Sequence, residues 1–268
     1  MKKLLSIITA GLMLFQLGYA MDEITMEGST TVLSIAQIAA EVYMDNNADV
    51  DISVRGGGSG VGIASLLEGT CDIADASRPI KDKELNKAVE KGINPVAHVV
   101  AMDALCIVVH SSNPIKNLTK QQIKDIYTGK ISYWDEVGGP EKEIVIVSRD
   151  TASGTYETFM KLVLDKQKTR PDSLLEASNK AVATVVSHTP GGIGYIGLGY
   201  LNSSVKALTA NGVKCTKENA LSGKYPFSRL LFMYTNGEPK GAVKDFMDFI
   251  KGIDGQKLVE EVGYIGLE

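Results

Sequence analysis

Short β-branched or apolar runs alternate with helix-length stretches along almost the whole chain of 268 residues. Strands are predicted at 24–26, 50–54, 73–76, 96–109, 144–147, 194–197 and 230–234, and helices at 32–46, 60–68, 82–91, 120–128, 156–166, 179–188 and 241–251. In the first helix Leu33, Ala36, Ala40 and Tyr43 recur at three- and four-residue spacing, which is typical of one buried face. The alternation predicts an α/β fold with mainly parallel sheets flanked by helices.

Two segments are candidate boundaries between lobes, a division that the family resemblance given below also implies. The apolar strand that ends at residue 110 runs into SSNP (111–114), and PFS (226–228) precedes another apolar strand. If both segments cross, the first lobe is discontinuous and consists of 21–110 with 229–268, and the second lobe is 111–228. Two hinge crossings are what a protein that closes over a cleft requires.

The first twenty residues are predicted to be an export signal (1–20). Lys2 and Lys3 precede an apolar run at 4–17, and Gly18 and Ala20 place small residues where a signal peptidase cleaves. Cleavage near Ala20 would start the mature chain near Met21. No cysteine follows the apolar run, so no lipoprotein anchor is expected and the predicted location is the periplasm.

The overall charge limits the class of partner. The chain has 28 basic and 32 acidic residues, and loss of the two N-terminal lysines leaves 26 against 32, a net charge of −6. Such a surface repels the phosphates of nucleic acids, so no nucleic-acid partner is predicted. A small anion would have to be held by local features that act against this global field.

No arrangement typical of an enzyme or a metal site is found. The sequence has no Gly-x-x-x-x-Gly-Lys-Ser/Thr motif and no serine with glycine two positions away on both sides. The histidines and cysteines lack metal-ligand spacing; they are His98, His110, His188, Cys71, Cys106 and Cys215. Cys71 and Cys106 are interpreted as small buried hydrophobes, and a disulfide is left open without assigned partners. We therefore predict no catalytic residues, no cofactor and no metal.

Three segments place glycine and hydroxyl residues between a strand and a helix. They are EGSTT (27–31), RGGGSG (55–60) and SRDTASGT (148–155). A helix start has N–H groups without intrahelical partners at the positive end of the helix dipole, and glycine lets a ligand approach closely. Ser and Thr also cap ordinary helices, so a single segment indicates little. Three of them at the carboxyl ends of strands favour an anion site.

Two arginines lie close to these segments. Arg149 precedes Ser153 by four residues, and its planar guanidinium suits a bidentate contact with a tetrahedral oxyanion. In DIADASRP (72–79), Ser77 and Arg78 end a strand. Ser77 has a hydroxyl that donates or accepts, and Arg78 is placed either against the ligand or at the rim of its site.

The chain resembles the phosphate-binding subunit of bacterial phosphate ABC transporters, a member of the periplasmic binding-protein superfamily. The similar stretches are GSTTV (28–32), RGGGSGVG (55–62), DIADASRPI (72–80), NLTKQQIKDIYTGKISYW (117–134), SRDTASGTYETF (148–159) and GGIGYIGLGYL (191–201). The resemblance implies a monomeric, two-lobed receptor that captures inorganic phosphate between its lobes and delivers it to the transmembrane subunits of an ABC importer. The predicted phosphate ligands are Ser29, Thr30, Thr31, Ser59, Ser77, Arg149, Ser153, Gly154 and Thr155, with Gly60 and Arg78 as further candidates.

One position departs from the family pattern. Some members have an aspartate where this chain has Ser77, and that carboxylate accepts a proton from phosphate and so rejects sulfate. Asp75 lies two residues away and shares a face with Ser77 on an extended strand. Three alternatives stay open: a receptor for another oxyanion (sulfate, molybdate or tungstate), a phosphate-handling enzyme, and a sensor or adhesion protein.

Overall fold

The computed structural model describes residues 21–267, so the predicted export signal lies outside the described residues. The long strands are β1 (Asp22–Gly28), β2 (Val50–Gly56), β3 (Ile73–Ala76), β4 (Pro95–His110), β6 (Val145–Arg149), β8 (Gly192–Gly197) and β11 (Ser228–Asn236). The helices include α1 (Leu33–Asn46), α2 (Ser59–Glu68), α3 (Asp82–Glu90), α4 (Lys120–Tyr127), α5 (Gly154–Leu162), α6 (Asn179–His188) and α8 (Gly241–Lys251). These fourteen elements confirm the predicted ones, with ends shifted by a few residues.

The remaining elements were missed because they are short or carry weak signals. They are β5 (Asn117–Leu118), β7 (Leu174–Glu176), β9 (Val205–Ala207), β10 (Thr209–Ala210), α7 (Lys217–Leu221), α9 (Ile253–Glu261) and the 3₁₀ turns η1 (Trp134–Val137) and η2 (Leu198–Tyr200). In α9, Gly255 interrupts the helical pattern of the sequence, but the packing of the helix requires a glycine at this position. A Cβ on Gly255 would lie 2.4 Å from Cα of Ile250, so only glycine lets α9 approach the end of α8.

The strands form a mixed sheet in the order β2-β1-β3-β11-β4-β8-β6-β7, with β9 also paired to β4. The pairs β1–β2, β1–β3, β6–β7 and β6–β8 are parallel, as the strand–helix alternation predicts. Every antiparallel pair in this sheet includes β4 or β11. The two long connecting strands therefore account for the departure from a parallel sheet.

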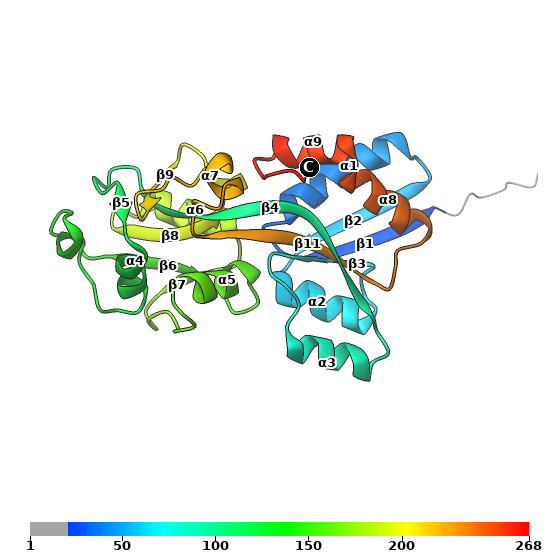
Figure 1. Ribbon diagram of the computed structural model, residues 1–268, viewed down its shortest axis with the longest axis horizontal. Helices are drawn as coiled ribbons and strands as arrows, with labels where there is room; N and C mark the ends of the chain where they lie inside the picture. Colours follow the sequence, from blue (N-terminus) through cyan, green and yellow to red (C-terminus); the bar gives the residue numbers. More distant parts are fainter. Residues whose placement is uncertain (1–20, 268) are drawn as a thin grey trace, which may run out of the picture.

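The chain forms two lobes that share β4 and β11 (Figure 1). Lobe 1 holds β1–β3, α1–α3, α8 and α9, and lobe 2 holds β5–β10 and α4–α7. β4 pairs with β11 along residues 95–104 and then with β8 and β9 along residues 105–110. The residue boundaries of the lobes given above stay a prediction.

Each lobe has its own apolar core. In lobe 1 the helices α1, α8 and α9 cover one face of the sheet, and α2 and α3 cover the other. A third apolar cluster fills lobe 2 around β4, β8, α4, α5 and α6. Because β1, β3 and β6 end where the lobes meet, the loops that follow them are brought to one place.

One of the two cysteines that were interpreted as small buried hydrophobes is in a disulfide. Cys106 is bonded to Cys215, with the two Cα atoms 5.6 Å apart, so it is half of a disulfide rather than a plain buried hydrophobe. Cys71 is a buried free thiol, as expected, and burial raises its pKa to about 12. None of the helices described between residues 21 and 267 is long and apolar enough to cross a bilayer.

Candidate anion-binding site

The structure brings the starts of α1, α2 and α5 together at the junction of the lobes. We call the nine predicted ligands at this junction the anion seat; they are Ser29, Thr30, Thr31, Ser59, Ser77, Arg149, Ser153, Gly154 and Thr155. All nine are buried. The strand-to-helix segments therefore lie in one buried polar site, while the role of each residue as a ligand stays a prediction.

Direct contacts join seat residues of the two lobes. Thr31 Oγ1 lies 3.0 Å from Thr155 Oγ1, and Nη2 of Arg149 donates to Thr30 Oγ1 at 3.2 Å. Within lobe 1, the hydroxyls of Ser59 and Ser77 are 3.3 Å apart. A Cβ on Gly154 would lie 2.2 Å from Ser59 Oγ, so a glycine is needed where the start of α5 meets the start of α2.

Several backbone donors in the seat have no acceptor. The N–H groups of Thr30, Ser59, Gly154 and Thr155 have no hydrogen-bond partner among residues 21–267. By contrast, Tyr156 N–H donates to Ser153 Oγ in an ordinary N-cap. Buried N–H groups without a partner are rare in folded proteins, and here they come from three helix starts at one location. Such a set of donors suits an anion.

Arg149 provides the seat with a buried positive charge. Its side chain donates from Nε to the carbonyl of Glu176 and from Nη2 to the carbonyl of Ala177, both at 2.9 Å, while Nη1 has no partner in the described chain. No carboxylate within residues 21–267 forms an ion pair with this guanidinium. Burial lowers its pKa, and the negative charge of Asp150 opposes that effect only in part. A buried guanidinium without a counterion favours a bound anion.

Two further candidates are occupied by other partners. The N–H of Gly60 donates to the carbonyl of Ala152 at 2.9 Å, across the lobes. Arg78 forms ion pairs with Glu84 at 2.8 Å and with Glu157 at 2.9 Å. Arg78 therefore contacts both lobes, and neither Gly60 nor Arg78 is among the free donors of the seat.

Sequence reasoning missed a second buried arginine. Arg229 donates from Nη2 to Thr31 Oγ1 and Thr155 Oγ1, each at 3.1 Å, and to Asp103 Oδ2 at 2.7 Å. Asn179 also donates to Thr31 Oγ1, at 2.9 Å. No local motif surrounds Arg229 or Asp103, so only the pairing of β4 with β11 places them beneath the seat. Because Asp103 neutralises Arg229, the uncompensated charge of the seat belongs to Arg149.

Asp75, whose role as an acceptor was left open, forms no hydrogen bond with a side chain of the seat. Both oxygens of Asp75 are buried without a hydrogen-bond partner in the described chain, and burial raises the pKa of this carboxyl well above its usual range. Its backbone carbonyl accepts from Ser29 N–H at 2.8 Å. Among residues 21–267, no carboxylate is hydrogen-bonded to a side chain of the seat; the nearby carboxylate of Asp103 accepts from Arg229 instead.

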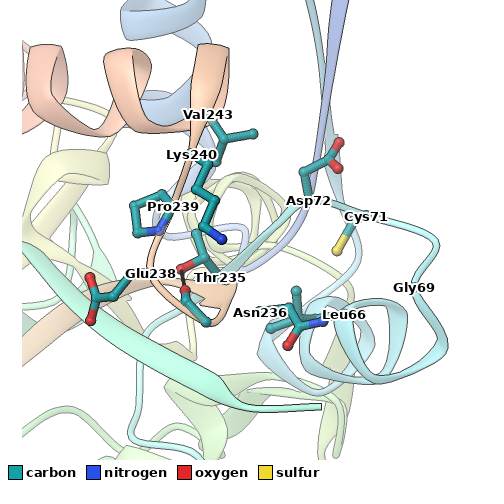
Figure 2. A pocket seen from close by; sticks show the side chains of 11 residues that line it. Leu66, Gly69, Cys71, Asp72, Thr235, Asn236, Glu238, Pro239, Lys240 and Val243 are labelled. Atoms are coloured by element: carbon teal, nitrogen blue, oxygen red, sulfur yellow. Dashed lines mark hydrogen bonds between the residues drawn. The ribbon is translucent and has the colours of Figure 1, made fainter. Parts of the chain in front are cut away.

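A pocket of about 520 Å³ at the opposite end of lobe 1 differs from the seat (Figure 2). Two of its polar side chains have partners: Asp72 accepts from Thr25, and Thr235 contacts His98 Nε2 at 2.8 Å. Among the described residues no group of three His, Cys, Asp or Glu side chains is arranged to hold a metal ion. The unpaired Nη1 of Arg149 and the unpaired N–H groups of the three helix starts thus lie at the seat and not in this pocket.

A two-lobed α/β protein with an enclosed polar site between its lobes has the architecture of a periplasmic-type substrate-binding protein. In agreement, the family model of the PBP superfamily domain matches residues 17–251. The phosphate-binding protein PstS of Bacillus subtilis is 36% identical over 251 residues, covering 92% of this chain and 81% of the relative. The chain therefore belongs to the PstS family of phosphate-binding proteins within the PBP superfamily.

Solved structures agree with this assignment. A phosphate ABC transporter substrate-binding protein from Clostridium perfringens, solved with bound phosphate, is 32% identical with a TM-score of 0.86, covering 92% of this chain and all of that one. An ABC-type phosphate transport receptor from Vibrio cholerae is 33% identical with a TM-score of 0.76, covering 91% of this chain and all of that one. These similarities extend over both lobes.

Proposed function

We propose that this protein captures inorganic phosphate in the anion seat and delivers it to the transmembrane subunits of an ABC importer. The observation that carries the proposal is the buried guanidinium of Arg149, which has a free Nη1 and no carboxylate partner among residues 21–267. Four unpaired N–H groups from three helix starts surround the same site. A tetrahedral anion with several acceptor oxygens satisfies this set of donors better than a planar or neutral ligand does.

The family supplies the identity of the anion and of the partner. The relatives in Bacillus subtilis and Clostridium perfringens are named for phosphate binding and for a phosphate ABC transporter. We extend the anion, phosphate, and the partner, an ABC transporter, to this chain. We further propose that the protein is a monomer without a nucleic-acid partner and that it is exported to the periplasm after cleavage near Ala20. We further propose the lobes 21–110 with 229–268 and 111–228, which the separate apolar clusters support. A binding role rather than an enzymatic one follows from these names and from a seat without a nucleophile–base pair.

Binding is coupled to closure of the lobes. Contacts from Thr31 to Thr155, from Arg149 to Thr30, and from Gly60 to Ala152 all cross from one lobe to the other. The anion stabilises this closed arrangement because donors of both lobes reach it at once, and a ligand shifts such an equilibrium only through its preference for one state. The closed form is the one that would dock on the importer.

A second oxyanion such as sulfate is the competing ligand. The observation in its favour is that the seat has hydroxyls but no free carboxylate to accept a proton from phosphate. Ser77 Oγ, which lies 3.3 Å from Ser59 Oγ, is the group that we assign as the acceptor. Molybdate and tungstate, which are larger tetrahedral anions, belong to the same alternative.

Isothermal titration calorimetry of the anion-stripped mature protein tests the proposal. We expect one-to-one phosphate binding with a Kd of about 1 μM, which corresponds to about −8 kcal/mol, and no heat from sulfate added to the same cell. If sulfate bound and phosphate did not, the seat would remain an anion site, but the assignment of phosphate as its ligand would be wrong. No heat from either anion would contradict the receptor role itself.

A further inference from the structure

A lysine-lined groove of about 570 Å³ runs along the line where the two lobes meet. Lobe 1 contributes the residues around the start of α3, and lobe 2 contributes α5 and the segment after it. The lysines that line the groove are Lys81, Lys83, Lys161, Lys166 and Lys168. The last four are exposed to solvent.

The groove has a strong excess of positive charge. Lys81 is paired with Glu157, but the other four lysines form no ion pair with any residue in the described range 21–267. The chain as a whole has a net charge of −4. Four unpaired cations in one groove therefore reverse the sign of the local field on an acidic protein.

The groove lies close to the anion seat. α5 begins with Gly154 and Thr155 in the seat, and its next turns place Tyr156 and Lys161 in the groove. Lys161 is six residues beyond Thr155, which is about 9 Å along the helix axis. This separation is close to the Debye length of about 8 Å at physiological ionic strength, so the field of these lysines reaches the seat only partly screened.

The groove is lined from both lobes, on elements other than the two connecting strands. In the view of Figure 1, β4 and β11 cross between the lobes, and α3 and α5 lie below them. Lys81, the residue before α3, pairs with Glu157 of α5. Separation of the lobes would break that contact and leave lysines on both sides of the opening.

We propose that this groove is an electrostatic vestibule that speeds the arrival of phosphate at the seat. The inference rests on the proposed function and adds a kinetic role for residues that do not touch the bound anion. A dianion that approaches a net-negative protein is repelled, whereas a cleft lined with opposite charge raises association rates by about 10- to 1,000-fold. The four lysines should therefore affect the association rate constant more than the dissociation rate constant.

Stopped-flow measurement of phosphate binding tests this with two charge-matched variants of the mature chain. The first replaces Lys83, Lys161, Lys166 and Lys168 with Gln. The control replaces four exposed lysines outside the groove, Lys214, Lys224, Lys240 and Lys251, with Gln. Both variants lose four positive charges, so they separate the local field from the net charge.

At low salt we expect the association rate constant to fall about tenfold in the groove variant and less than about twofold in the control. In about 0.5 M salt the difference should largely vanish because the charges are screened. An equal fall of the association rate constant in both variants, or no fall in either, would overturn the proposed vestibule. A change in the dissociation rate constant alone would overturn it too. Failure of the unmodified protein to bind phosphate would instead contradict the proposed function.

Discussion

Arg229 of β11 and Asp103 of β4 form a buried ion pair between the two strands that join the lobes, with Nη2 2.7 Å from Oδ2. The two residues lie directly opposite each other in the register of the sheet. The same guanidinium donates to Thr31 in lobe 1 and to Thr155 in lobe 2. The ion pair therefore connects the strands shared by the lobes to hydroxyls on both sides of the anion seat.

Loss of one partner of this pair should destabilise the fold strongly. We expect Arg229→Met to lower the free energy of unfolding by about 3–5 kcal/mol, because Asp103 is left as a buried charge without a counterion. The double variant Arg229→Met/Asp103→Asn should recover most of that loss, since the amide still accepts from Leu198 N–H. Urea unfolding of the three proteins measures this. Equal stabilities of the single and double variants would contradict the assigned pairing.

Arg149 should dominate the affinity for phosphate. Arg149→Ala removes a charged hydrogen-bond donor worth about 1.5–3 kcal/mol, so we expect phosphate binding to weaken by tens- to hundreds-fold. Arg149→Lys retains the charge but loses the planar fork and should give an intermediate affinity. Arg170, which pairs with Asp172 at the surface of lobe 2, offers Arg170→Ala as a control. Calorimetric titration that finds full affinity in Arg149→Ala would remove this residue from the site.

How far the sequence predicts this protein depends on whether a feature is local. Apart from α9, the strands and helices with seven or more residues were predicted, because hydrophobic periodicity is a local signal. The seat residues were found for the same reason, since each helix start carries its glycines and hydroxyls within a few positions. Arg78 shows the limit of this local signal. Its position at the end of a strand, next to Ser77, is typical of a ligand-binding residue, but its guanidinium forms ion pairs with Glu84 and Glu157.

Features set by tertiary pairing were not predictable. Asp103 and Arg229 are separated by more than a hundred positions, and only the pairing of β4 with β11 makes them neighbours. The partner of Cys106 was equally undetermined, because Cys215 lies 109 residues away. α9 was missed because Gly255 looks like a helix breaker, whereas in the structure it allows close packing against α8.

Glu157 should favour the closed arrangement of the lobes. It lies on α5 in lobe 2 and pairs with Arg78 of lobe 1 at 2.9 Å, so the contact exists only when the lobes are together. Loss of a partly exposed ion pair costs about 1 kcal/mol, and we therefore expect Glu157→Gln to weaken phosphate binding about fivefold.

Glu84 provides the matched control for this prediction. It binds the same guanidinium from α3, within lobe 1, so its contact does not depend on closure. Glu84→Gln should change the phosphate Kd by less than about twofold, because it leaves the open–closed equilibrium unaltered. Equal effects of the two variants in calorimetry would show that Arg78 does not report on closure.

Asp75 should make the protein less stable as the pH rises. Burial raises the pKa of the Asp75 carboxyl in the folded state above its unfolded value of about 4. At a pH between these two pKa values, the native state holds a proton that the unfolded state has lost. Over that window each pH unit costs about 1.4 kcal/mol of stability. Asp75→Asn removes the proton linkage and should stabilise the protein at pH 7 while changing little at pH 4. Urea unfolding at both pH values checks the sign; a pH-independent difference would mean that Asp75 does not titrate in this window.

Ser77 should decide between phosphate and sulfate. Its Oγ lies 3.3 Å from Ser59 Oγ, and a Cβ on Gly154 would lie 2.7 Å from it, so a side chain at position 77 faces the seat. A carboxylate there accepts a proton from phosphate but repels sulfate, which has none to donate. We therefore expect Ser77→Asp to raise the ratio of phosphate to sulfate affinity by about tenfold, or about 1.4 kcal/mol. Ser77→Asn has nearly the same shape without the charge and should leave the ratio near that of the unmodified protein. Competition of the two anions in calorimetry separates these outcomes, and an unchanged ratio in Ser77→Asp would show that selectivity is set elsewhere in the seat.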